Sequence, residues 1–295
     1  MSKQDPDWLR TGQGDRPRQR WAFTADAPLL SLELVRETGE ILAADESGGL
    51  YLLDRRGKIR ALSRGFHDLS SLTWSDTGTY GAALLDEATV CRFDRRFDVK
   101  WSITLYEAVT AVVISPYGNH VAVSMANGSN LILDDRKRKI ANFETVRPLS
   151  FLQFVAEAPA LLGAAEYGLI CRHKLNGAEV WSEKLWSNVG DMSATGDGKH
   201  LYVAGFNRGI QAFALDGENT GSYVVEGTPN HISTSYMQKR IAATTLERHF
   251  YWLAAGGQML WATHLPDDAC RLLCDPRGEW VVCGFKSGRV VFLEW

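Results

Sequence analysis

The chain has 295 residues, 45% of them hydrophobic and 23% charged, and its formal net charge at pH 7 is −3. This is the composition of a globular protein, and the small net charge gives no general attraction to nucleic acid or to an anionic membrane. No stretch approaches the ~18 apolar residues of a membrane span, and the polar N-terminal stretch lacks the apolar run of a secretory signal.

Residues 1–15 are polar apart from Trp8 and Leu9. A polar terminal segment usually frays, so we expect a flexible N-terminal tail over residues 1–15. A short docking motif around Trp8 is the alternative. The rest of the chain repeats itself, so we expect a single domain over residues 16–295.

Residues 16–295 divide into seven successive repeats of 40 residues. One column of the repeat is apolar in all seven, and another holds tryptophan in every second repeat. A period near 40, made of short β-rich units, is typical of a β-propeller. The apolar column consists of Leu32, Leu72, Val112, Leu152, Met192, Ile232 and Leu272, and the tryptophans are Trp21, Trp101, Trp181 and Trp261.

The third repeat shows the plan of one unit. We expect strands over residues 111–115, 120–125, 131–133 and 140–144. The first two are separated by a Pro-Tyr-Gly turn, and Asn127-Gly128 is a hairpin signal between the next two. Four antiparallel strands per repeat predict an all-β, seven-bladed propeller.

The last repeat stops at Trp295, directly after its third strand. Residues 20–23 (RWAF) match residues 100–103 (KWSI) in the column of the fourth strand. The N-terminal strand is therefore expected to complete the last blade and close the ring. Such pairing removes two exposed sheet edges, which would otherwise invite aggregation.

Residues 115–118 (SPYG) before residues 121–123 (VAV), and Phe93-Asp94 at the end of a third strand, resemble WD40-type repeats. Residues 176–181 (NGAEVW), echoed at 257–261 (GQMLW), resemble the tryptophan-docking repeat of quinoprotein-type propellers. These resemblances imply the propeller fold and its use as a binding platform. The calcium-ligand carboxylates and disulfide of the quinone-dependent enzymes are not visible, so we expect no cofactor.

The five cysteines lie in expected strands and are odd in number. We interpret them as buried, reduced thiols, which favours a cytoplasmic protein. Cys270 and Cys274 have the spacing of a ligand pair, but a structural zinc site needs a second pair. No metal is therefore expected.

One face of the propeller, here called the connection face, carries the connections between blades and the hairpins between second and third strands. Aromatic and basic residues gather there, as they do in protein-binding hot spots. The alternative is that the aromatic residues in the connections wedge between blades. The candidate partner-binding residues are Phe66, His67, Tyr106, Arg147, Tyr167, Trp186, Phe206, Arg208, Phe285 and Lys286.

The opposite face, here called the turn face, carries the turns between first and second and between third and fourth strands. Three neighbouring turns form a basic sector that could attract an acidic partner, RNA or anionic lipid. Interleaved aspartates favour a solvated, turn-forming cluster instead. The basic residues are Arg55, Arg56, Lys58, Arg95, Arg96, Arg136, Lys137, Arg138 and Lys139.

Asp191, His231 and Arg271 share one column on the expected innermost strands of three successive blades. With Ser193 and Ser233 two positions further on, a Ser-His-Asp arrangement is conceivable. No motif for an activated hydroxyl or an oxyanion hole accompanies them. We therefore favour a structural polar bridge between blades, and a small-ligand or catalytic site at the channel mouth is the rival.

The repeats keep nearly the same length throughout and insert no long loops. Functional loops are usually where length varies. The sequence therefore predicts a non-catalytic protein–protein interaction platform rather than an enzyme.

Overall fold

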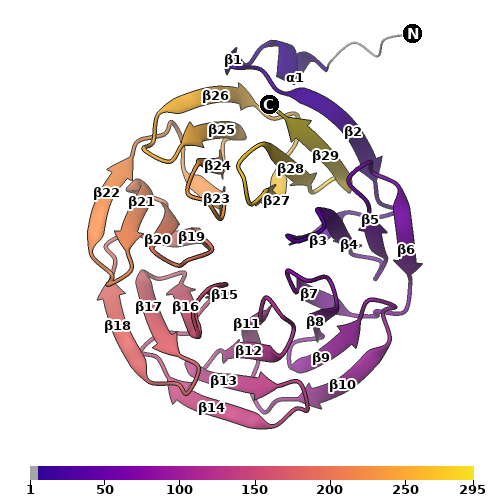
Figure 1. The fold of residues 1–295 in the computed structure, drawn as a ribbon, viewed down its shortest axis with the longest axis vertical. Coiled ribbons are helices and arrows are strands. Elements are labelled where there is room, and N and C mark those ends of the chain that lie inside the picture. The colour runs from indigo at the N-terminus through magenta and orange to yellow at the C-terminus, as the bar shows by residue number, and fades with distance from the viewer. Residues whose placement is uncertain (1–5) are drawn as a thin grey trace.

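The computed structural model describes residues 6–295, which form a seven-bladed β-propeller around a central channel (Figure 1). Each blade contains a four-stranded antiparallel sheet whose strands run outward in sequence order from the channel. The predicted fold class is confirmed. Blade one consists of β3 (Leu29–Val35), β4 (Glu40–Asp45), β5 (Leu50–Leu53) and β6 (Ile59–Ser63). Blade two consists of β7 (Leu69–Trp74), β8 (Tyr80–Leu85), β9 (Thr89–Asp94) and β10 (Val99–Thr104). Blade three consists of β11 (Val109–Ile114), β12 (His120–Met125), β13 (Ser129–Asp134) and β14 (Lys139–Glu144).

The remaining four blades follow the same order, except that the last one takes its outer strand from the N-terminal region. Blades four and five consist of β15 (Phe151–Phe154), β16 (Ala160–Ala165), β17 (Leu169–Lys174) and β18 (Glu179–Lys184), and of β19 (Val189–Ala194), β20 (His200–Gly205), β21 (Gly209–Ala214) and β22 (Asn219–Tyr223). Blades six and seven consist of β23 (Pro229–Thr234), β24 (Arg240–Thr245), β25 (His249–Ala254) and β26 (Met259–His264), and of β27 (Ala269–Cys274), β28 (Trp280–Phe285), β29 (Arg289–Glu294) and β2 (Arg18–Thr24).

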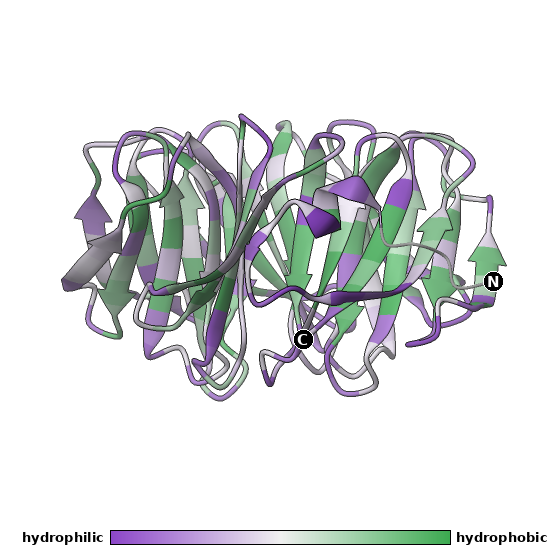
Figure 2. Cartoon of the chain, turned by 90° about the horizontal axis from the view of Figure 1, so that it is seen from above, coloured by the Kyte–Doolittle hydropathy of each residue, from purple (hydrophilic) through white to green (hydrophobic). Residues whose placement is uncertain are grey.

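The core lies between adjacent blades, because each sheet buries both faces against its neighbours. Figure 2 shows hydrophobic residues along the strands and hydrophilic residues at many of their ends. In the apolar column of the repeat, Leu32 is fully buried and Leu152 is the one member that keeps partial exposure. Burying one such side chain contributes about 1.5–3 kcal/mol, so the column stabilises every interface between blades.

The ring closes as the sequence predicted. Strand β2 pairs antiparallel with β29, from Arg18 opposite Glu294 to Thr24 opposite Arg289. Trp21 in β2 packs against Phe292 in β29 with ring centroids 5.3 Å apart. The first and last strands thus share one sheet, and the outer edge of β29 is covered.

Three of the four column tryptophans connect their blade to the next one by a hydrogen bond, whereas Trp261 Nε1 has no hydrogen-bond partner within residues 6–295. The indole Nε1 of Trp21 donates to the backbone oxygen of Arg55 over 2.9 Å, and Trp101 donates to that of Asp135 over 3.0 Å. Trp181 donates to the backbone oxygen of Leu215 over 2.8 Å. At Gly57, under the Trp21 ring, φ is +74° and an added Cβ would lie 2.7 Å from the indole. Glycine is therefore needed there for its conformation and its small size.

Residues 6–15 pack on blade six, where we expected a frayed tail. They form a short helix, α1 (Asp7–Arg10), and strand β1 (Gln13–Gly14), which adds a fifth strand beside β26 (Figure 1). Trp8 and Leu9 are buried with Trp261 and Phe285 in the core between blades six and seven. Burying two large apolar side chains offsets the entropy that a free terminus would keep.

No helix in residues 6–295 is long and apolar enough to cross a membrane.

Candidate interaction surfaces and the central channel

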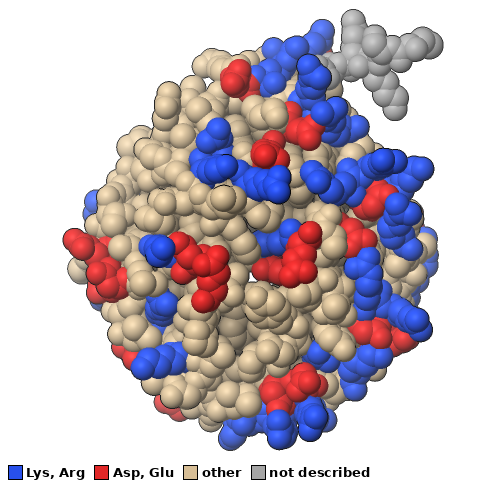
Figure 3. All heavy atoms as spheres, in the orientation of Figure 1, with Lys and Arg blue, Asp and Glu red and all other residues tan. Residues whose placement is uncertain are grey.

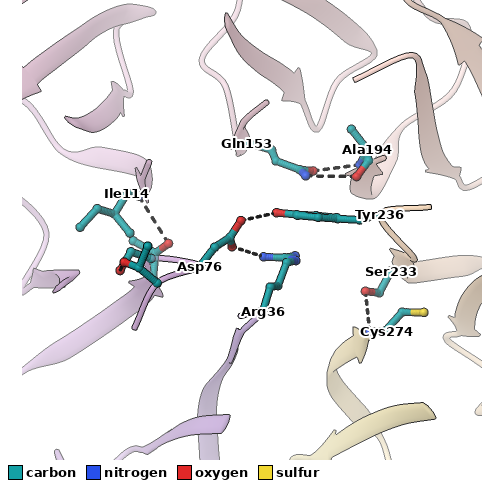
Figure 4. Close-up of polar contacts among 11 residues, drawn as sticks. Arg36, Asp76, Ile114, Gln153, Ala194, Ser233, Tyr236 and Cys274 are labelled. Atoms are coloured by element: carbon teal, nitrogen blue, oxygen red, sulfur yellow. Dashed lines mark hydrogen bonds and ion pairs between the residues drawn. The ribbon is translucent and has the colours of Figure 1, made fainter. Parts of the chain in front are cut away.

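A belt of hydrogen bonds joins the innermost strands around the channel. In each bond, a side chain of one inner strand meets the backbone of the next inner strand, 41 residues further along the chain. These bonds satisfy backbone groups on the inner strands, which are sheet edges facing the channel. The side chains are Ser31, Thr73, Gln153, Asp191, Ser193 and Ser233, and several of the bonds are drawn in Figure 4.

Asp191 belongs to this belt, and His231 lies beside it on the next inner strand. The Asp191 carboxylate accepts from the backbone N–H groups of Met192 over 2.8 Å and Ile232 over 3.1 Å. His231 Nδ1 lies 3.9 Å from Asp191 Oδ2, and its Nε2 lies 3.1 Å from the backbone oxygen of Ala269. Burial lowers the pKa of His231, which favours the neutral imidazole. The pair therefore connects blades five, six and seven.

Arg271 extends the polar chain to blade one. Its guanidinium lies 3.7 Å from the carboxylate of Glu33, whose pKa is raised by burial. The structure thus brings all three predicted channel residues into one neighbourhood. The three residues share one repeat column, and a β-bulge directly precedes each of them.

The two serines near this cluster are occupied by the backbone. Ser193 Oγ accepts from the N–H of Thr234 over 3.0 Å, and Ser233 Oγ accepts from that of Cys274 over 2.9 Å. Within the described chain, neither hydroxyl has a hydrogen bond to a histidine. A general base must lie within hydrogen-bond reach of the nucleophile it activates. Both hydroxyls are therefore used in contacts between neighbouring blades.

One feature of the channel was not predicted from the sequence. Arg36, Asp76 and Tyr236 follow the inner strands of blades one, two and six, and their side chains meet inside the channel (Figure 4). Arg36 Nη1 lies 2.9 Å from Asp76 Oδ1, the Tyr236 hydroxyl donates to Asp76 Oδ2 over 2.6 Å, and the Arg36 guanidinium lies 4.6 Å from the Tyr236 ring centre.

We call these three residues the channel triad. They stand in one repeat column whose members at 116, 156, 196 and 276 are proline, alanine or glycine. Three bulky polar residues in a column of otherwise small residues or proline are the sequence signal that could have pointed to this cluster. The triad borders a cavity of about 300 Å³ in the channel. It occupies the end of the channel nearest the turn face.

The connection face has one strongly exposed apolar region. Its residues come from blade connections and one hairpin in blades two to six, and we call them the apolar arc. They are Tyr106 (73% exposed), Val146 (89%), Tyr167 (65%), Trp186 (81%) and Val224 (94%). Neither Val146 nor Val224 was among the predicted partner-binding residues, because aliphatic residues in a strand-rich sequence are usually buried.

Two of the predicted partner-binding residues are buried. Phe66 packs edge-on against Phe93 in the core between blades one and two, with ring centroids 4.9 Å apart. Phe285 is 1% exposed and packs against Trp8. Phe66 is a wedge between blades, the alternative considered for the connection aromatics, and Phe285 is buried at the end of β28. Neither offers a surface to a partner.

The remaining predicted residues surround the apolar arc or lie across the ring from it. Arg208 is exposed and lines a hollow of about 540 Å³ beside Trp186, together with Lys184 and Gln211. Arg147 and Phe206 are half-buried. His67 and Lys286 are exposed but belong to blades one and seven, away from the arc.

All nine residues of the basic sector are exposed. Each of the three turns begins with an aspartate whose carboxylate accepts backbone N–H groups of its own turn. For Asp54, hydrogen bonds from the N–H groups of Lys58 and Arg56 lower the pKa of the carboxyl. Asp94 and Asp134 repeat this arrangement. These aspartates shape the turns, and the basic side chains project from them.

The five cysteines are free, and four are fully buried. Burial raises the pKa of Cys91 and of Cys270 to about 11, so both are thiols at neutral pH. Residues 6–295 contain no group of three or more His, Cys, Asp and Glu side chains arranged to hold a metal ion.

No protein-family model and no curated protein sequence matches this chain. Many solved structures match its fold. One is the β-propeller domain of Cps50 (Swd1) from Myceliophteria thermophila, with a TM-score of 0.81 and 15% sequence identity over 95% of this chain and 99% of that one. At this identity the likeness shows the fold, a WD40-like seven-bladed β-propeller.

Proposed function

We propose that this WD40-like propeller is a non-catalytic platform that binds a partner protein through the apolar arc on its connection face. The observation that carries the proposal is the concentration of exposed large apolar side chains there. Trp186 and Val224 are 81% and 94% exposed, on neighbouring connections of one rigid face. Exposed apolar patches rimmed by polar residues mark interaction sites.

The hollow beside Trp186 supports the same interpretation. It runs between the outer strands of blades four and five and is bordered by Lys184, Arg208 and Gln211. The Lys184 ammonium lies 5.3 Å from the Trp186 ring centre. Tryptophan, tyrosine and arginine carry most of the binding energy in interfaces, and they do so around pockets that accept a partner side chain.

The channel offers less support for a catalytic function. Ser193, Ser233 and Asp191 all use their side-chain oxygens on backbone N–H groups of the belt. The platform would therefore act without chemistry of its own. The five free cysteines agree with a reducing compartment, and we propose the cytoplasm as its location.

The test is affinity capture from a native lysate followed by quantitative mass spectrometry. The double variant Tyr106→Ala/Trp186→Ala should lose a defined set of partners that the unchanged protein retains. Removing two hot-spot aromatics should weaken binding of an identified partner at least about 30-fold. Exposed side chains contribute little to the fold, so the melting temperature should stay the same.

The matched control is Tyr117→Ala/Met237→Ala, which removes two exposed apolar side chains from the turn face. It should keep the partners. Loss of the same partners in both double variants, or in neither, would contradict docking on the connection face.

A further inference from the structure

The turn face carries a second surface that is independent of the apolar arc. Arg56, Arg96 and Arg136 occupy the same position in the turns between third and fourth strands of blades one, two and three. The corresponding residues of the next three blades are Asn176, Asp216 and Gly256. Among these six blades, arginine at this turn position is therefore confined to blades one to three, and we call the three residues the arginine arc.

Each arginine is held at its base by the turn. The backbone N–H of Arg56 donates to Asp54 Oδ1 over 2.8 Å, that of Arg96 to Asp94 over 2.8 Å, and that of Arg136 to Asp134 over 2.9 Å. The flanking backbone in blades one and three is also fixed by the indole bonds of Trp21 and Trp101. A fixed base lowers the conformational entropy that binding would cost.

The arginine side chains form no ion pair within residues 6–295. The carboxylates near them are occupied by other basic groups: Asp54 with Arg60, Asp94 with Lys100 and Asp134 with Arg138. Further unpaired basic side chains of the described chain adjoin the arc. These are Arg55, Lys58, Lys137 and Lys139. Figure 3 shows lysine and arginine gathering along the right and lower rim, over blades one to three.

A hollow of about 630 Å³ lies at the blade-one end of the arc. Arg55, Arg56, Arg60 and Arg95 line it together with Thr38, Glu40 and Asp54. The Arg55 guanidinium lies 5.7 Å from the Trp280 ring centre, and its side chain crosses Gly39, where an added Cβ would lie 2.8 Å from it. The planar fork of arginine matches a carboxylate, with which it forms two parallel hydrogen bonds.

We propose that the arginine arc binds an acidic segment of a protein partner, so that the propeller holds one partner on each face. A peptide can place its carboxylates opposite the arginines and neutral residues opposite Asp98 and Asp135, which lie in the same turns. A nucleic acid has uniform, dense charge and would meet those aspartates. The aromatic residue of these turns, Phe97, is 8% exposed and packs on Trp74, so it offers no stacking platform for bases.

The experiment measures fluorescence anisotropy of a labelled peptide of alternating glutamate and glycine. The unchanged protein should bind it at low ionic strength, and the affinity should fall as salt is added. The triple variant Arg56→Ala/Arg96→Ala/Arg136→Ala should bind about tenfold more weakly, since three exposed charge pairs are lost. Its melting temperature should be unchanged, because the turns use the backbone rather than the side chains of these residues.

The control is Lys199→Ala/Lys239→Ala/Arg277→Ala, which removes three exposed charges from turns of blades five to seven on the same face. It should bind the peptide within about twofold of the unchanged protein. Equal weakening of the two triple variants, or no binding by the unchanged protein, would overturn the proposal.

Two further probes decide the class of partner. A uridine oligoribonucleotide of the same net charge and vesicles of phosphatidylcholine with phosphatidylserine should bind more weakly than the peptide. Tighter binding of either one, lost in the arginine variant, would replace the peptide by RNA or by a membrane. The variant Tyr106→Ala/Trp186→Ala should bind the peptide normally, so failure on one face is distinguishable from failure on the other.

Discussion

The Tyr236 hydroxyl donates a hydrogen bond to the Asp76 carboxylate over 2.6 Å, although the two residues belong to blades six and two and are 160 positions apart. Other bonds around the channel join neighbouring blades. This one crosses the ring, and Arg36 from blade one binds the same carboxylate. The channel triad therefore restrains the ring against changes of shape that adjacent-blade contacts tolerate.

Replacing Tyr236 by phenylalanine should remove this cross-ring bond and keep the ring in place. A hydrogen bond to a charged group contributes about 1.5–3 kcal/mol, so the free energy of unfolding should fall by that amount. Asp76→Ala should cost more, about 3–5 kcal/mol, because it leaves the Arg36 guanidinium without its partner in a largely buried site. Urea unfolding of both variants measures the difference, and equal losses would contradict the proposed order.

Deleting residues 16–26 should destabilise the whole ring, because it removes β2 and exposes the edge of β29. Trp21 and Phe23 would also leave the core between blades seven and one. A loss of several kcal/mol corresponds to a fall in melting temperature of at least about 10 °C. Thermal unfolding followed by circular dichroism tests this, and an unchanged melting temperature would show that β2 does not close the ring.

Trp8→Ala should lower the free energy of unfolding by about 3–5 kcal/mol, the usual cost of truncating a buried tryptophan. Trp8 is 7% exposed and contacts Trp261 and Phe285. Arg10→Ala, at an exposed position of the same short helix, is the control and should change stability little. Equal stability of the two variants would mean that residues 6–15 are not tightly packed in solution.

Stability should fall as the pH drops below about 6.5, the ordinary pKa of histidine. Burial lowers the pKa of His231, and also of His120 and His173. Between the lowered pKa and 6.5 the unfolded chain binds more protons than the folded one, so folding is weakened there and is at full strength above 6.5. His231→Gln should reduce the slope of unfolding free energy against pH between 5 and 7.

The sequence predicts the fold in detail because the propeller is local and periodic. The apolar column at Leu32 marks the core of each interface, and the match of residues 20–23 to residues 100–103 predicts the closing strand. Hydrophobic character alone does not distinguish a wedge from an exposed anchor. Phe66 and Tyr106 share a column, and one is 4% exposed whereas the other is 73% exposed.

The channel triad and the N-terminal contact escape prediction for a different reason. Whether Tyr236 reaches Asp76 depends on the width of the channel, which no periodicity reveals. Trp8 lies outside the repeat, so its partners Trp261 and Phe285 cannot be found from a column. The polar belt could be predicted in part. The sequence shows that Asp191 and His231 share a column, but it does not show that these side chains bond to the backbone of the next blade.

The tryptophan column has a consequence for the symmetry of the ring. Tryptophan stands on the outer strands of blades seven, two, four and six. The ring has seven blades, an odd number, so tryptophan on every second blade cannot continue all the way around it. The alternation is broken at one place, where the adjacent blades six and seven both carry a column tryptophan. There Trp261 is covered by residues 12–14, and the indole of Trp295 donates to Asp15. The propeller thus has one interface unlike the other six, and a circular permutation that opened the ring elsewhere would still leave the mismatch at this place.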